Sequence, residues 1–176
     1  MAHILGLDIS SSKVGIALID YDENIIISEV LKFKPTMTLE ERAAKFAHKM
    51  KEIDKHYVPF DIFVEQPAMM FKGGKTTAQT IAKLQRFNGM CCYALYTIFD
   101  LNPTMINPNT ARSAIGIKVP RGIPPNKKKQ FIIENISNRF GQQFSYQLTY
   151  KGNPKPGTDD RADALVVALA GLVVDK

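Results

Sequence analysis

Residues 3–9 read His-Ile-Leu-Gly-Leu-Asp-Ile, an apolar run that one carboxylate, Asp8, interrupts. A second apolar run follows at 13–20, and both runs are predicted to be buried β-strands. An ionised carboxylate inside a buried strand is costly unless it is paired or bound to a cation. We therefore expect Asp8 either to satisfy a local backbone group or to hold a metal ion or a substrate.

The segments that follow Asp8 predict a three-stranded meander, then a helix and a fourth strand. Short polar links separate the first three strands and suit antiparallel pairing. Thr38 and Glu41 form a capping box ahead of helically spaced apolar residues. Pro67 stops the fourth apolar run. The expected elements are strands at 3–9, 13–20 and 25–34, a helix at 39–57 and a strand at 62–65.

The second half of the chain predicts mainly helices. Residues 116–126 form a loop with three prolines, and residues 142–158 show little periodicity. Asn126 is a suitable N-cap for the helix that follows it. The expected elements are a helix near 76–99, a strand at 104–106 with a short helix after it, a helix from Asn126 to Gly141, and a helix at 159–174.

This order of elements predicts an α/β fold with a five-stranded mixed sheet. Three antiparallel strands continue into two parallel ones, and helices flank the sheet. A right-handed crossover through the 39–57 helix returns the chain to the open side of the first strand, so the fourth strand lies beside it. At 176 residues the chain is long enough for one domain, expected to span 1–176.

Composition excludes several classes of protein. The apolar content of 45% and charged content of 23% are typical of a soluble globular protein. We expect no membrane span, because no apolar run approaches about 18 residues. No signal peptide is expected at the N-terminus. Cys91 and Cys92 are adjacent and lack zinc-site spacing, so we expect free thiols in a reducing cytoplasm.

Charge is distributed unevenly along the chain, whose net charge is +6. Residues 67–158 carry 13 Lys and Arg against 2 Asp and Glu, whereas 1–66 carry 8 against 11. Such asymmetry favours a polyanionic partner, with nucleic acid the first candidate. The alternative is a basic face kept for solubility, which would normally intersperse both signs.

Three further acids are candidates to join Asp8. Glu65 also terminates an apolar strand, and parallel neighbours lie about 4.8 Å apart, so Asp8 and Glu65 can converge at one sheet edge. Each could instead be an ordinary strand-end residue exposed to water. Asp160 and Asp163 share one face of the last helix. Helix capping and the macrodipole would explain one or two of these acids, but Asp163 lies where the helix turns towards the core.

Four carboxylates brought together would repel one another unless divalent cations bound them. Hard oxygen ligands of this kind suit Mg²⁺ or Mn²⁺. Because the middle of the chain is basic, the four acids predict two-metal phosphodiester hydrolysis, with two cations per active site and no small-molecule cofactor. In this scheme Asp8 is the shared ligand, Glu65 completes one site, and Asp160 and Asp163 complete the other.

The ordered motifs resemble the RuvC-type Holliday-junction resolvases. These motifs are 4–8 (Ile-Leu-Gly-Leu-Asp), 14–17 (Val-Gly-Ile-Ala), 64–66 (Val-Glu-Gln) and 160–165 (Asp-Arg-Ala-Asp-Ala-Leu), and they span almost the whole chain. The resemblance implies an RNase H-like fold, a homodimer, cleavage of four-way DNA junctions, and Mg²⁺ or Mn²⁺ at the active site. It implies that Asp8, Glu65, Asp160 and Asp163 are the metal-binding catalytic acids, and Asp159 is interpreted as a helix cap.

The chain departs from this family in two places. The family has an aromatic residue shortly after its Glu-Gln, at the junction centre, whereas here the nearest is Phe71. Met69, Met70 or Phe71 could act as an apolar wedge, or could pack against the partner or the core. The 116–129 segment is longer than the family pattern and basic, and it is expected to bind phosphates. The residues expected to contact DNA are Phe71, Lys72, Lys75, Arg112, Lys118, Arg121, Lys127, Lys128 and Lys129.

Two other functions compete with a nuclease. Actin-like sugar kinases also begin with an apolar strand and an Asp, but they are much longer and need glycine-rich phosphate loops, a pattern that Gly73 and Gly74 do not complete. A non-catalytic basic module that binds branched DNA could keep the same fold. The apolar segment 81–99 could supply a dimer interface, or could be a helix buried between layers.

Overall fold

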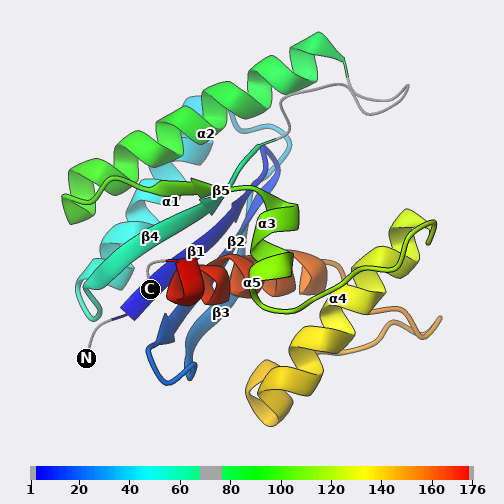
Figure 1. Cartoon of the computed structure of the whole chain (residues 1–176). Helices are drawn as coiled ribbons and strands as arrows, with labels where there is room; N and C mark the ends of the chain where they lie inside the picture. Colours follow the sequence, from blue (N-terminus) through cyan, green and yellow to red (C-terminus); the bar gives the residue numbers. More distant parts are fainter. Residues whose placement is uncertain (1–2, 68–76, 175–176) are drawn as a thin grey trace.

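The computed structural model describes residues 3–67 and 77–174, and Figure 1 shows one mixed sheet with helices on both faces. The strand order is β3-β2-β1-β4-β5. The first three strands are antiparallel neighbours, and the last two run parallel to β1. This arrangement confirms the predicted sheet, including the pairing of the first and fourth strands. The strands are β1 (His3–Ile9), β2 (Lys13–Asp20), β3 (Ile25–Lys32), β4 (Pro59–Glu65) and β5 (Thr104–Ile106).

The helices divide between the two faces of the sheet (Figure 1). α1 and α2 pack against each other and cover one face. α5 lies directly on the opposite face, against β1, β2 and β4, and both α3 and α4 pack on α5. The helices are α1 (Leu39–Asp54), α2 (Ala78–Phe99), α3 (Pro108–Ala114), α4 (Pro125–Phe140), the short 3₁₀ helix η1 (Gly141–Phe144) and α5 (Thr158–Val174).

Alternating side chains of the central strands form two cores. Leu5 and Leu7 of β1 point towards α1 and α2, where Phe46 and Phe87 are fully buried. Ile4, the residue before Leu5, points towards α5. This period of two is the physical basis for assigning each strand residue to a face. The alternation places Asp8 on the α5 face, because its neighbours in β1 contact the other core.

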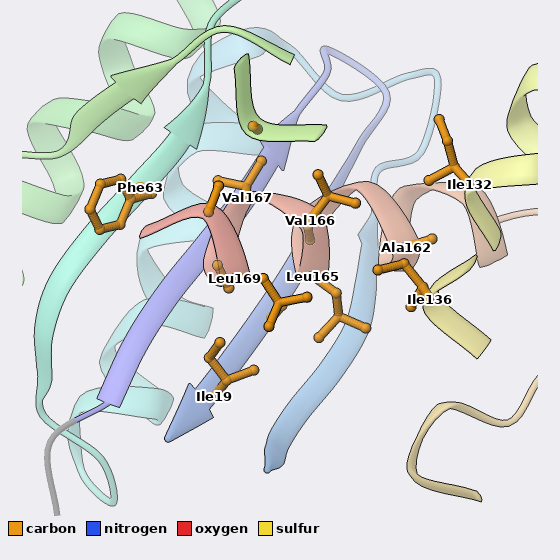
Figure 2. Packing of buried hydrophobic residues seen from close by; sticks show 14 of the residues in the cluster. Ile19, Phe63, Ile132, Ile136, Ala162, Leu165, Val166, Val167 and Leu169 are labelled. Atoms are coloured by element: carbon orange, nitrogen blue, oxygen red, sulfur yellow. The ribbon is translucent and has the colours of Figure 1, made fainter. Parts of the chain in front are cut away.

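α5 is buried around most of its circumference, because the sheet covers one side and α3 and α4 cover the other. Figure 2 shows Leu165, Val166 and Leu169 between the sheet and the outer helices. A helix that is apolar on all sides is expected in such a middle layer. The acidic first residues of α5 are therefore carried to the sheet by a deeply anchored helix.

Several predicted boundaries are wrong by a few residues. β4 begins at Pro59 rather than at 62, because the exposed Phe60 and the charged Asp61 mask the strand pattern. α4 begins at Pro125, so Asn126 lies inside the first turn and is not the cap. Proline is favoured at that first position, since its φ is already helical. β3 ends at 32 and α1 at 54, while the capping box of Thr38 is confirmed.

Two composition-based expectations can be compared with the described residues. Cys91 and Cys92 are both free thiols, and Cys91 is fully buried. Within 3–67 and 77–174, no helix has the length and apolarity that crossing a membrane requires.

Candidate active site

Four carboxylates from three separate elements gather on the α5 face of the sheet. Asp8 comes from β1 and Glu65 from the end of β4, and their strands pair in parallel at Leu7 and Val64, one residue before each acid. Asp160 and Asp163 come from the start of α5. The pKa of Asp8 is raised by its three acidic neighbours, which places all four in one electrostatic group. We call these four residues the carboxylate cluster.

Two glycines let α5 approach closely enough to complete the cluster. A Cβ atom on Gly15 of β2 would lie 2.1 Å from the backbone oxygen of Asp160. A Cβ atom on Gly6 of β1 would lie 2.5 Å from the backbone oxygen of Ala164. Real Cβ atoms do not approach that closely, so only glycine fits either position. The glycines of the first two strands thus set the distance between Asp160 and the sheet.

Burial and mutual repulsion both disfavour ionisation of the cluster. Desolvation raises the pKa of Asp8 well above its usual value, and Glu65, Asp163 and Asp160 raise it further. Desolvation and the charge of Asp163 raise the pKa of Glu65 to about 7. Desolvation is also the largest cause of the raised pKa values of Asp160 and Asp163. The cluster therefore lacks enough positive charge for four ionised carboxylates.

Two cations offset part of this charge. Lys13 Nζ donates to Asp160 Oδ2 at 2.5 Å, and Arg112 Nη2 donates to Asp163 Oδ1 at 3.5 Å. Arg112 is therefore in the cluster itself, with a side chain only 12% exposed, and not on an open surface. Its Nε is buried and has no hydrogen-bond partner among the described residues. The sequence interpretation missed Lys13, although its position five residues after Asp8, at the start of the next strand, is a usable signal.

The chemistry of the cluster fits divalent cations. Its ligands are all carboxylate oxygens, the class that Mg²⁺ and Mn²⁺ prefer, and a bound cation would supply the missing positive charge. As the side chains lie in the described residues, no three acidic, His or Cys groups surround one point as a ready ligand set. Asp160 and Asp163 are instead turned towards Lys13 and Arg112. Each of these ion pairs engages one oxygen of its carboxylate.

The prediction that Asp159 caps the last helix is wrong. α5 begins one residue earlier, at Thr158, so Asp159 lies inside the first turn. Its carboxylate accepts a hydrogen bond from Lys129 Nζ of α4. The pair joins α4 to the start of α5.

Apart from Arg112, the predicted DNA-binding residues fall into three groups. Lys128 of α4 lies near enough to Glu65 to lower its pKa, and Lys129 contacts Asp159, so α4 borders the cluster. Lys127 is exposed in the first turn of α4, and Lys118 and Arg121 are exposed in the loop before it. The predicted residues outside the described part of the chain are Phe71, Lys72 and Lys75, together with the wedge alternatives Met69 and Met70.

Comparison with solved structures identifies the class of fold. Thermus thermophilus RuvC, in a complex with a Holliday junction substrate, matches with a TM-score of 0.68 over 99% of this chain and 96% of its own, at 15% identity. The yeast mitochondrial Holliday junction resolvase Ydc2 matches with a TM-score of 0.60 at 14% identity, over 97% of this chain and 78% of its own. The fowlpox virus resolvase, in a complex with Holliday junction DNA, matches with a TM-score of 0.51 at 15% identity, over 97% and 96%.

These likenesses confirm, at the level of the fold, the resemblance to RuvC-type resolvases found in the sequence. The chain has the RNase H-like fold of those proteins over nearly its whole length. No family model and no curated protein sequence matches the chain.

Proposed function

We propose that this chain is a metal-dependent endonuclease that resolves four-way DNA junctions, with residues 1–176 forming one nuclease domain. The observation that carries the proposal is the carboxylate cluster, four acids with raised pKa values drawn from β1, β4 and α5 beside a basic helix. Structural neighbours that are Holliday junction resolvases support branched DNA as the substrate.

The cluster would hold two divalent cations, Mg²⁺ or Mn²⁺. Bound cations supply an activated water and neutralise charge on the leaving 3′ oxygen. Asp8 would be the ligand shared by both cations, because its strand β1 lies in the middle of the sheet, next to β4. Lys13 and Arg112 lower the pKa values of Asp160 and Asp163, against the burial that raises them, and so offset part of the repulsion between the start of α5 and the sheet.

Basic residues of the α3–α4 region would hold the DNA backbone. Lys128 and Lys129 border the cluster, and Lys118, Arg121 and Lys127 extend the positive surface away from it. Contacts of this kind supply affinity and orientation but little sequence information. The DNA is thereby positioned with one phosphate at the carboxylates.

A homodimer would use the outer side of α2 and nick both strands symmetrically. One side of α2 is buried through Phe87, Cys91 and Leu95, whereas Tyr93 is 71% and Tyr96 47% exposed on the other. Exposed aromatic residues on one helix face are typical of a protein interface. We expect light scattering to give twice the chain mass, and the double variant Tyr93→Glu, Tyr96→Glu to give the single mass. A wild-type monomer at micromolar concentration would contradict the dimer.

Cleavage of a synthetic four-way junction tests the function. We expect nicking by the wild-type chain in Mg²⁺ or Mn²⁺, and retained binding without cleavage for Asp8→Asn. Asp22→Asn is the matched control, because it removes an exposed carboxylate in the β2–β3 turn. Undiminished cleavage by Asp8→Asn would refute the assignment.

The second candidate is a non-catalytic module that binds branched DNA with the same fold. One observation favours it: the side chains of the described acids are not arranged as a ready metal-ligand set. The two functions differ in a metal titration of nicking activity. A nuclease nicks branched DNA only with the metal and loses this activity in Glu65→Gln, whereas a binding module leaves the junction intact under every condition.

A further inference from the structure

A basic recess lies beside the carboxylate cluster, on the side opposite α3. It has a volume of about 490 Å³ and lies between β3, the segment after η1 and the first turn of α5. Its charged lining residues are Lys32, Lys155 and Arg161, and none of its lining residues within the described part of the chain is an acid. Ser145 and Thr158 add polar atoms to the wall. A concave surface with three cations and no carboxylate fits an anionic ligand.

The three cations of the basic recess have no carboxylate partner within 4.0 Å among the described residues. Arg161 is fixed by neutral groups instead: its Nε donates to Ser28 Oγ at 3.1 Å and its Nη1 to the Ser145 backbone oxygen at 3.1 Å. Its guanidinium lies over the Phe144 ring at 4.8 Å. The positive charge of Arg161 is therefore positioned by the fold, and no carboxylate of the described residues neutralises it.

Strand register fixes the distance from the recess to the cluster. Asp8 of β1 pairs with Gly15 of β2, and Gly15 pairs with Val30 of β3, which lines the recess. Directly paired residues share one face of a sheet, and neighbouring strands lie about 4.8 Å apart. The recess thus begins about 10 Å from Asp8 on the α5 face. A DNA strand with one phosphate at the cluster can place a nearby phosphate there.

A small hairpin extends from the rim of the recess. Lys155 N donates to the Gln147 backbone oxygen at 2.9 Å, and Leu148 bridges to Pro154. At its tip Tyr150 is 93% exposed, with Lys151 Nζ 5.5 Å from the ring centre. Residues 135–158 contain no acid. Figure 1 shows this segment, between α4 and α5, projecting away from the sheet.

We propose that the basic recess binds a backbone phosphate of the DNA arm that flanks the cut, and that the 147–155 hairpin lies along the same arm. This inference rests on the proposed function, because it takes branched DNA as the ligand. It adds a second DNA contact beside the cluster, between β3 and the start of α5. Lys32, Lys155 and Arg161 bind the phosphate, and the exposed ring of Tyr150 packs against the sugar or base edge of the arm.

Salt-dependent binding tests the phosphate contact. The double variant Lys32→Ala, Lys155→Ala is made in an Asp8→Asn background, and junction affinity is measured by fluorescence anisotropy across a salt series. Each lost phosphate contact reduces the slope of log K against log salt by about 0.9, so we expect a reduction of about 1.8. We also expect binding at physiological salt to weaken by about tenfold. Arginine at both positions should preserve the slope.

The matched control removes the same charge from the opposite face of the sheet. Lys51→Ala, Lys55→Ala changes two exposed lysines at the end of α1 and should leave slope and affinity unchanged. If the Lys32→Ala, Lys155→Ala variant and its Asp8→Asn parent bind the junction with equal salt slopes, the phosphate site in the recess is wrong and the proposed function stands. Failure of the parent to bind a junction at any salt concentration would overturn the proposed function together with the recess.

The hairpin is tested separately by Tyr150→Ala and Tyr150→Phe. We expect the alanine variant to bind the junction several-fold more weakly and the phenylalanine variant to bind as the parent does, because the ring makes the contact. Equal affinity of the alanine variant would exclude the hairpin from the DNA interface.

Discussion

Asp8 and Asp20 lie at opposite ends of the β1–β2 ladder and have opposite environments. Asp20 pairs with His3, and its oxygens accept hydrogen bonds from Asp22 N at 3.0 Å, Asn24 N at 2.8 Å and Asn24 Nδ2 at 2.9 Å. The Asn24 side chain and these backbone donors lower its pKa. Desolvation and three neighbouring acids raise the pKa of Asp8.

The contrast separates a carboxylate that the fold stabilises from one that we propose to be functional, in the same pair of strands. Asp20 stabilises the turn that joins β2 to β3, because the fold supplies donors for its charge. Asp8 has three acids as neighbours, and Lys13 offsets only part of their effect on its pKa, so a bound cation would stabilise its charge. The sequence shows an Asp near the end of an apolar run in both cases, and only the surroundings separate them.

The largest expected effect contrasts Glu65→Gln with Asp20→Asn. Glu65→Gln should reduce junction cleavage by at least about 100-fold, because it removes a proposed metal ligand. Asp20→Asn should leave cleavage nearly unchanged and reduce the free energy of unfolding by about 1 kcal/mol, through a lost charged hydrogen bond. In EDTA, Glu65→Gln should raise stability, since repulsion within the cluster falls. Single-turnover kinetics measure cleavage, and urea denaturation measures the free energy of unfolding. Loss of cleavage in Asp20→Asn would contradict the assignment of Asp20 to a purely structural role.

Gly15→Ala should move α5 away from Asp8. The added Cβ meets the Asp160 backbone, so overpacking should cost about 1–3 kcal/mol and cleavage should be lost. Gly89→Ala is the control for folding stability, because nothing lies within 4 Å of a Cβ at that exposed helical site. It should stabilise the chain by about 0.5–1 kcal/mol. Unchanged stability and cleavage in Gly15→Ala would mean that close helix approach does not build the site.

The two carboxylate environments also predict opposite pH dependences in EDTA. The pKa of Glu65 is raised from 4.5 to about 7 in the folded chain. The stability that this raised pKa contributes is therefore present below pH 4.5 and is lost as the pH rises from 4.5 to about 7. Asp20 has a pKa lowered from 3.8, so its contribution is present above that value and is lost on acidification. Urea midpoints against pH should flatten above pH 4.5 in Glu65→Gln. A wild-type profile identical to that variant's would contradict the raised pKa.

The smallest effect is expected for Asp159→Asn, next to the cluster. The ion pair with Lys129 is partly exposed, and such pairs contribute about 0–1 kcal/mol. Cleavage should stay within a few-fold of wild type, whereas Asp160→Asn should abolish it. Equal losses in the two variants would make Asp159 a member of the site.

Local signals were sufficient to predict the sheet and the convergence of the four acids on it. The apolar runs around Asp8 and before Glu65 mark buried strands in isolation, and the spacing of Asp160 and Asp163 places both on one helix face. The pairing of β1 with β4 followed from crossover handedness, a rule that needs no side-chain detail.

Contacts made only in the folded chain could not be predicted. Arg161 becomes informative when α5 packs on the sheet, where its guanidinium lies beside Ser28 and Ser145. The hairpin in 142–158 has little periodicity, because its few hydrogen bonds need no buried face. The roles of Gly6 and Gly15 depend on a helix about 150 residues away in sequence.

Calorimetric titration with Mn²⁺ tests the central claim, that the carboxylate cluster is a divalent-cation site. The account predicts two ions bound per chain in the wild type and in Asp20→Asn, and affinity at least tenfold weaker in Asp8→Asn. Equal binding of Mn²⁺ by all three proteins, or binding lost in Asp20→Asn and kept in Asp8→Asn, would contradict it.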